Sequence, residues 1–350
     1  MKIACLALNS KQLGGATTFN LATSFSLKNF GHKDSTYDFF EIAGRDKKAK
    51  GACNNNFTAL NYRKLEKTME ILDGYDLIHI LSGQKYKEGD PKLDFIRHLT
   101  SKKKWIITLH GISEFKFYPW LKDMMGEDNC VGWISTKEEV TAMYDFNNHS
   151  ATIPICIPSK AIDRDIARDK WVFAARIAAA KGIVEFLKIA DVTDEPVEIY
   201  GRGYGMEEYT LLQKLDEVCG ENPNITFHGE YQPSETRDIY SDAKLAFDLS
   251  KYDNKKGIQY VDLEAMKSGA ILVCFDSLNL HPSVDDAVIY INREELLNNP
   301  EKVVGDIVAK ISDSAWVNNA LDIYERVLST IFSPKHFANK MDEFYKEVCK

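Results

Sequence analysis

Short apolar segments alternate with longer amphipathic segments along most of the chain. Each apolar segment has the length of a β-strand, and the intervening segments place apolar residues at helical spacing. This alternation predicts an α/β fold, in which helices cover parallel sheets. The expected strands are residues 2–8, 75–82, 105–111, 131–136, 151–158, 171–176, 197–203, 224–230, 245–250, 271–276 and 287–291.

The alternation stops once and then restarts. It lapses near Pro158–Arg168, where Ser, Asp and Arg cluster. We therefore expect two doubly wound, Rossmann-like domains, residues 1–160 and 161–332. The last segment, residues 333–350, reads as an amphipathic helix with Ser333 at its N-cap and proline at its first position. We expect this helix to pack back toward the first domain.

Composition narrows the class of protein. The chain has 350 residues, of which 44% are hydrophobic and 27% charged, and these are values of folded proteins. The apolar runs are too short to cross a membrane, and the start lacks the apolar core of a signal peptide. The seven cysteines include no CxxC pair. We interpret them as reduced thiols of a cytoplasmic protein, located in the host cytoplasm if a phage encodes it.

Charge is unevenly distributed between the two halves. Residues 1–160 hold 22 basic and 18 acidic residues, a net charge of +4, whereas residues 161–350 hold 22 and 34, a net charge of −12. The first half could accept a polyanionic partner, which the second half would repel.

Two cations five residues apart mark one candidate site. The strand-like WVFAAR ends at Arg176, and helical spacing begins near Lys181–Gly182. On one helix these cations would diverge by about 140°. At a strand end and the following helix start, both can point beyond the carboxyl edge of a sheet. This placement predicts an anionic ligand.

Glycine-rich loops give a second, weaker signal. Gly14–Gly15 lies between a strand and a helix, where backbone amides can approach an anion, although a tight turn would need the same residues. The GRGYG segment at 201–205 lacks the spacing and position of a dinucleotide-binding fingerprint. We therefore reject a dehydrogenase.

The segment 253–276 is the most informative. If residues 257–268 are helical, Lys256, Tyr260 and Glu264 share one stripe, while Ile258, Val261 and Ala265 form the buried stripe. A glutamate in a crevice can accept hydrogen bonds from ribose hydroxyls. A lysine at a helix start suits phosphate, helped by the backbone amides of Ile258, Gln259 and Tyr260. A solvated surface helix is the alternative. The expected ligand contacts of this segment are Lys256, Gly257, Ile258, Gln259, Tyr260 and Glu264.

Three further patterns carry less weight. The aromatic run at 115–120 could stack on an extruded base or an acceptor sugar, but it also fits a packed lid. Lysines 102–104 are typical of a solvated turn. Asp163–Arg164–Asp165 mimics a metal-binding DxD but falls in the expected linker, and we predict no metal site.

The motifs in order resemble those of retaining GT-B glycosyltransferases of the family 4 type. They are the Gly-Gly loop, TLHG, IPxxIP, R-x4-KG, IYGRG, ITFHGEYQPSE, YSDAKLAFDLS and Y-x-x-LE-x4-G-x3-V. The resemblance covers nearly the whole chain. GGATTFNLA and GIQYVDLEAMKSGAILVCF also resemble segments of phage DNA α-glucosyltransferases that act on hydroxymethylcytosine.

This resemblance implies a GT-B fold and a UDP-sugar donor held mainly by the C-terminal domain. Arg176 and Lys181 would neutralise the diphosphate, approached also by Gly14–Gly15, and Glu264 would hold the ribose. His110 would touch the sugar and help align the leaving group, although a histidine at a strand end can also be purely structural. The family's first paired glutamate lies eight residues before the second, and here that position is Lys256.

We therefore expect a metal-independent retaining glycosyltransferase. The expected acceptor is a hydroxymethylated pyrimidine in phage-type double-stranded DNA, which the overall acidity opposes. Alternatives are a cytoplasmic enzyme of surface polysaccharide or glycolipid synthesis, a non-catalytic UDP-sugar or nucleic-acid binding module on the same scaffold, and, last, a UDP-sugar epimerase.

Overall fold

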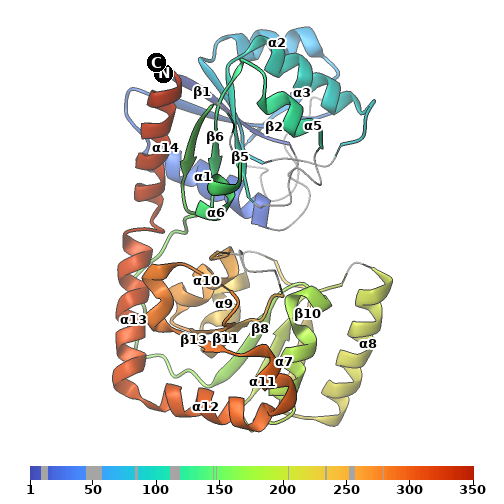
Figure 1. The fold of residues 1–350 in the computed structure, drawn as a ribbon, viewed down its shortest axis with the longest axis vertical. Helices are drawn as coiled ribbons and strands as arrows, with labels where there is room; N and C mark the ends of the chain where they lie inside the picture. Colours follow the sequence, from blue (N-terminus) through green and yellow to red (C-terminus); the bar gives the residue numbers. More distant parts are fainter. Residues whose placement is uncertain are drawn as a thin grey trace. The chain divides into compact units, whose positions relative to one another are not determined.

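Two parallel β-sheets organise the chain in the computed structural model (Figure 1). The chain divides into two units, which are described separately: Met1–Pro158 with Ile331–Lys350, and Ser159–Thr330. The structure describes residues 1–8, 15–44, 57–82, 86–110, 119–144, 146, 148–203, 205–232, 235–251, 257–278 and 280–350.

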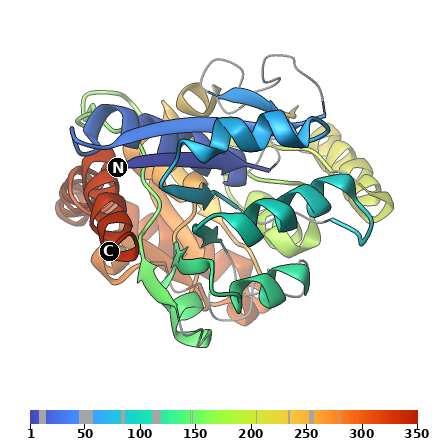
Figure 2. The same cartoon turned by 90° about the horizontal axis from the view of Figure 1, so that it is seen from above.

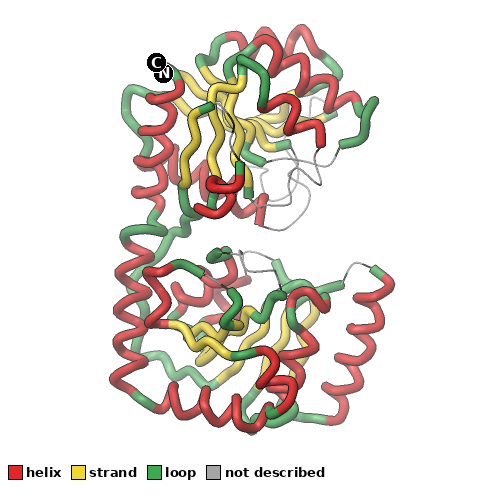
Figure 3. The backbone as a smooth tube through the Cα atoms, in the orientation of Figure 1, coloured by secondary structure: helices red, strands yellow, loops and turns green. Residues whose placement is uncertain are grey.

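The strands of the first unit, drawn in yellow in Figure 3, form one sheet. Their order is β3-β2-β1-β4-β5-β6-β7, and all are parallel. The order reverses between β1 and β4, as in doubly wound folds. Its strands are β1 Lys2–Ala7, β2 Thr36–Ala43, β3 Thr58–Asn61, β4 Leu77–Ile80, β5 Trp105–Leu109, β6 Cys130–Ser135 and β7 His149–Thr152. Its helices are α1 Gly15–Phe30, α2 Leu65–Asp73, α3 Pro91–Lys102, α5 Pro119–Met125, α6 Glu138–Met143 and α14 Pro334–Val348.

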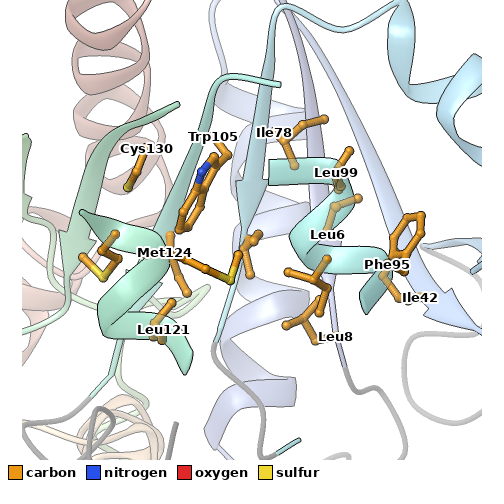
Figure 4. Close-up of a cluster of buried hydrophobic side chains, with 14 of the residues drawn as sticks. Leu6, Leu8, Ile42, Ile78, Phe95, Leu99, Trp105, Leu121, Met124 and Cys130 are labelled. Atoms are coloured by element: carbon orange, nitrogen blue, oxygen red, sulfur yellow. The ribbon is translucent and has the colours of Figure 1, made fainter. Parts of the chain in front are cut away.

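Helices cover both faces of this sheet. The α2, α3 and α5 helices lie over one face, where Leu6, Leu99 and Trp105 belong to a fully buried apolar cluster (Figures 2 and 4). The α1 and α14 helices pack against each other, and the rings of Phe19 and Phe337 lie 5.9 Å apart. Burial on both faces accounts for the continuous apolar strands seen in the sequence.

The C-terminal helix begins where the sequence predicted. Ser333 is the N-cap of α14, and its hydroxyl accepts a hydrogen bond from the amide of His336 at 3.1 Å. Pro334 occupies the first helical position, where its missing N–H costs nothing.

The second unit has the strand order β10-β9-β8-β11-β12-β13, again all parallel. Its strands are β8 Lys170–Ala174, β9 Val197–Tyr200, β10 Ile225–Gly229, β11 Ala243–Asp248, β12 Ile271–Phe275 and β13 Val288–Ile291. Its helices are η1 Ala179–Lys181, α7 Ile183–Ala190, α8 Met206–Glu221, α9 Thr236–Tyr240, α10 Tyr260–Ser268, η3 Pro282–Ala287, α11 Arg293–Asn298, α12 Pro300–Ser312 and α13 Ser314–Ser329. The prediction of two doubly wound α/β sheets is confirmed.

Three local predictions need correction. The strands β2 and β3 were not predicted, and the strand expected at 151–158 ends at Thr152. Proline recurs in the rest of that segment, and proline cannot donate to a sheet ladder. The helix expected at 257–268 begins only at Tyr260, because Gly257 has a left-handed φ of 59° and Gln259 is extended.

Among the described residues, no helix is long and apolar enough to span a membrane. The cysteines Cys5, Cys130, Cys156 and Cys274 are free and buried. Burial raises the pKa of the Cys5 and Cys156 thiols to about 12, so both stay protonated at neutral pH.

Candidate functional site

The candidate site of the second unit lies where the strand order of its sheet reverses. The adjacent strands β8 and β11 end there, at Ala174 and Asp248, and the chain leaves them in opposite directions. Open parallel sheets bind ligands at such a position, beyond the carboxyl ends of the strands. Arg176 and Lys181 both belong to the connection that follows β8.

Gly182 lets the two connections approach each other closely. Its φ is 81°, and a Cβ there would lie 2.1 Å from the carbonyl oxygen of Leu249. The neighbouring amide of Lys251 donates to the carbonyl of Ala180 at 2.8 Å. A glycine directly after Lys181 is therefore required by backbone geometry, which explains the KG pair of the sequence.

Lys181 reaches a polar network at the start of α10. Its Nζ donates to Oε1 of Gln259 at 3.3 Å, and Nε2 of Gln259 donates to Oδ2 of Asp248 at 2.6 Å. The other carboxylate oxygen of Asp248 accepts hydrogen bonds from the amide and the hydroxyl of Ser250, at 3.2 and 2.6 Å. Asp248 and Ser250 are buried. Neither was among the site residues expected from the sequence, although each stands at the polar end of a predicted strand.

Arg176 has a carboxylate partner. Its Nε lies 3.2 Å from Oε1 of Glu208, in the first turn of α8. The Arg176 side chain is 48% exposed, whereas that of Glu208 is 15% exposed. The guanidinium can therefore meet a ligand from solvent, in competition with Glu208.

A capping box defines the start of α10. The Gln259 side chain accepts from the amide of Asp262, and the amide of Gln259 donates to Oδ2 of Asp262 at 2.7 Å. The expected helix start is therefore wrong, since residues 257–259 are not helical, but Tyr260 and Glu264 lie four residues apart on α10 as expected. Lys256 itself lies outside the described residues. The Gln259 amide, expected to face phosphate, is engaged within the cap.

Glu264 lies on α10 and is partly buried. Burial raises the pKa of its carboxyl to about 7, against the opposing effects of Lys267 and of a hydrogen bond with Thr236. Burial raises the pKa of Tyr231 to about 12, and the charge of Glu264 adds to this rise. Tyr231, in the connection after β10, therefore lies near Glu264 on α10. The environment of Glu264 departs from that of a solvated surface helix.

Glu185 joins two further cations at this edge of the sheet. Its Oε1 lies 2.6 Å from Nζ of Lys251 and 2.8 Å from a guanidinium nitrogen of Arg293, while the side chain is 1% exposed. Burial opposes ionisation, but the two cations hold the pKa of Glu185 below its usual value. Sequence reasoning missed this triad because its members are spread over three elements.

His110 belongs to the first unit, directly after β5. Its Nε2 lies 3.1 Å from the carbonyl oxygen of Leu81, which can only accept, so Nε2 carries the proton. Burial lowers the pKa of His110 to about 4. The imidazole is neutral at pH 7, and its ring makes a T-shaped contact with that of Phe19, with centroids 4.5 Å apart.

The remaining candidates lie elsewhere or outside the described residues. Gly15 is the first residue of α1, whereas Gly14 and residues 115–118 lie outside them. Lys103 pairs with Asp73 at 2.8 Å, and Arg164 pairs with Asp322 at 2.6 Å. Within the described part of the chain, no group of three or more His, Cys, Asp or Glu residues could hold a metal ion.

Arg176, Lys181, Gln259 and Glu264 all belong to the second unit, where Lys181 and Gln259 are in contact, while His110 and Gly15 belong to the first. The second unit offers cations at a switch point, and a carboxyl on the neighbouring α10. These are groups that bind phosphate and hydroxyls.

Comparison with solved structures identifies the fold. An α-glucosyltransferase in complex with UDP and a 13-mer DNA superposes with a TM-score of 0.73, at 16% identity over 100% of both chains. Anabaena HepE in complex with UDP gives 0.72, at 14% identity over 99% of this chain and 100% of that one. A glycosyltransferase from Rickettsia africae gives 0.69, at 11% identity over 100% of this chain and 98% of that one. The chain has the GT-B fold.

Neither the family models nor the curated proteins searched include a match to this sequence.

Proposed function

We propose that the protein transfers a sugar from a UDP-sugar to an acceptor hydroxyl. The observation that carries the proposal is the placement of Arg176 and Lys181 at the switch point of a GT-B domain, with Glu264 on the neighbouring α10. Several solved structures with the same fold contain UDP or UDP-glucose. Here the two cations bind the diphosphate and Glu264 accepts hydrogen bonds from the ribose.

In the proposed reaction, the bond between C1 of the sugar and the β-phosphate oxygen breaks, and its electron pair leaves with UDP. The acceptor oxygen forms the new bond to C1, and its proton passes to the departing phosphate. Arg176 and Lys181 stabilise the negative charge that grows on the diphosphate. The transition state resembles an oxocarbenium ion.

Retention of configuration and the role of His110 follow from the family resemblance. Nε2–H of the neutral His110 is bound to Leu81. We propose that His110 contacts the sugar, as the resemblance implies. Arg176 and Lys181 would supply the charge stabilisation that a metal provides in other transferases.

We propose a hydroxymethylated pyrimidine of DNA as the acceptor. Two observations support it: the likeness to α-glucosyltransferases solved with DNA, one containing an HMU base, and the net charge of +4 in residues 1–160. The same cations and fold would serve an enzyme of polysaccharide or glycolipid synthesis, or a module that binds UDP-sugar without turnover.

UDP release tests the proposal directly. A panel of UDP-sugars is incubated with hydroxymethylcytosine-containing DNA, ordinary DNA or no acceptor, and the digested nucleosides are weighed by mass spectrometry. Release that requires the modified DNA, with a sugar mass on the base, would establish donor and acceptor together. In a further reaction liposomes replace the DNA. UDP release that liposomes stimulate and DNA does not would indicate a glycolipid acceptor. Tight UDP binding without release would identify a binding module, and no binding would overturn the donor site.

A further inference from the structure

Gln259 lies between a cation and a buried carboxylate. Its Oε1 is 3.3 Å from Nζ of Lys181, and its Nε2 is 2.6 Å from Oδ2 of Asp248. Asp248 is 7% exposed, and Ser250 donates two hydrogen bonds to its other oxygen. The hydrogen-bond donors to Asp248 from Ser250 and Gln259 are therefore neutral groups.

The orientation of the Gln259 amide is determined by its neighbours. The side-chain oxygen accepts from the amide of Asp262 in the capping box and from the ammonium of Lys181. Rotating the amide by 180° would turn its hydrogens toward both of these donors and its oxygen toward the carboxylate of Asp248. Only the observed orientation satisfies all three partners.

Other cations of this sheet edge are bound directly by carboxylates. Arg176 pairs with Glu208, and Lys251 pairs with Glu185. Lys181 donates to the uncharged side-chain amide of Gln259, which places its ammonium at the start of α10. A carboxylate at the same distance would neutralise the ammonium and compete with any anionic ligand.

We propose that Gln259 is a positioning residue for donor binding: it holds Lys181 at the start of α10 and separates it from Asp248, so that the charge of Lys181 acts on the diphosphate. This inference rests on the proposed function, because it assumes that UDP binds at this edge of the sheet. It assigns Gln259 a role through its side chain, beyond the backbone contact expected from the sequence.

Two substitutions separate this role from helix capping. Gln259→Glu keeps the shape but places a negative charge beside Lys181 and against Asp248. Gln259→Ser keeps a favourable N-cap residue but is too short to bridge the two groups. Gln213→Glu, at an exposed position of α8, is the matched control for the change in charge. Circular dichroism and thermal unfolding verify that each variant folds.

Binding of UDP and of uridine is measured by calorimetry. Gln259→Glu is expected to weaken UDP binding about tenfold and Gln259→Ser about threefold, with uridine affinity unchanged, because only UDP carries the diphosphate. In a Lys181→Met background, Gln259→Glu should change UDP affinity less than about twofold, because the ammonium through which Gln259 acts is absent.

The outcomes distinguish the two proposals. Equal losses for UDP and uridine, or an undiminished effect in the Lys181→Met background, would overturn the role of Gln259 and leave the donor site intact. Unchanged UDP affinity in a folded Gln259→Glu variant would do the same. If the wild-type protein binds neither UDP nor uridine, the proposed function fails, and the inference fails with it.

Discussion

The guanidinium of Arg176 lies 3.2 Å from a carboxylate oxygen of Glu208, in the first turn of α8. A diphosphate must share or displace this partner to reach Arg176. Glu208→Gln removes the competing charge, and we expect UDP affinity to rise about two- to fivefold, in line with the modest strength of exposed ion pairs. Calorimetry with Glu207→Gln as the matched control measures the effect. A loss of affinity would mean that Glu208 orients Arg176 instead of competing for it.

Removing the guanidinium itself should be far more damaging. We expect Arg176→Ala to lower turnover by about 10²–10³, as removal of one oxyanion-stabilising donor does in other enzymes. The assay is UDP release at saturating donor, with Arg237→Ala, an exposed position of α9, as control. A variant with full activity would exclude Arg176 from stabilising the leaving group.

The carboxyl of Glu264 gives donor binding a defined pH dependence. Its pKa of about 7 means that about half of the molecules hold a proton there at neutral pH. Ribose hydroxyls donate most strongly to the ionised form, so uridine affinity should rise with pH through about 7, with proton release on binding. Uridine is the probe because the terminal phosphate of UDP titrates in the same range. Glu264→Gln should remove this dependence. The measurement is uridine calorimetry from pH 5.5 to 8.5 in buffers of different ionisation enthalpy, and wild-type affinity that falls with pH would contradict the assignment.

The same group affects stability with the opposite sign. The pKa of Glu264 in the folded protein lies above the ordinary value of 4.5. Its contribution to the free energy of unfolding is therefore fully present below about pH 4.5 and is lost as pH rises through about 7. Glu264→Gln should therefore gain stability relative to the wild type at pH 8, by about 2 kcal/mol after allowance for partial exposure. Urea unfolding at pH 5 and pH 8 tests this, and a difference that is the same at both values would refute it.

Much of the fold could be predicted because buried parallel strands are continuously apolar. For example, the first and last residues of β8 and β12 lie within two residues of the bounds expected from their apolar runs. The strand β2, with the sequence TYDFFEIA, was overlooked because its polar residues interrupt that pattern. Pattern reasoning detects burial on both faces more readily than mixed strands.

The site was less predictable than the fold. The position of Arg176 and Lys181 in the connection after β8 follows from the alternation of strands and helices, which the sequence shows. Glu208 and Gln259 gain their significance from side-chain contacts across separate elements, and no spacing rule encodes these. The helix start was misplaced because a left-handed glycine and an extended cap residue look, in sequence, like the first turn of a helix.

Gly182 should tolerate no side chain. At its φ of 81°, an added Cβ would lie 2.1 Å from the carbonyl oxygen of Leu249. We expect Gly182→Ala to destabilise the protein by at least about 2 kcal/mol and to displace Lys181, which lowers UDP affinity. Gly220→Ala in α8 is the matched control, because its added Cβ meets nothing within 4 Å and should be neutral or slightly stabilising. Equal unfolding midpoints for the two variants would contradict the close approach.

A buried hydrogen bond between His79 and Tyr345 links the sheet of the first unit to α14. Nδ1 of His79 lies 2.7 Å from the Tyr345 hydroxyl, and Nε2 lies 2.8 Å from the hydroxyl of Thr108. Tyr345→Phe should cost about 1–2 kcal/mol of unfolding free energy at pH 7, because it leaves a buried ring nitrogen without this partner. Tyr209→Phe, at a 60% exposed position, should cost nothing measurable.

Protonation of His79 should also lower the free energy of unfolding of this unit in acid. Burial lowers its pKa from 6.5 to about 3, so the folded state stays neutral where the unfolded state takes up a proton. The resulting stability is fully present above about pH 6.5 and is lost as pH falls toward 3, at up to about 1.4 kcal/mol per pH unit. His79→Gln removes this titration, so its unfolding free energy should fall less steeply than that of the wild type between pH 6.5 and 4.5. Urea titrations across that range decide the matter: parallel curves for the two proteins would show that His79 is not the group that acid protonates on unfolding.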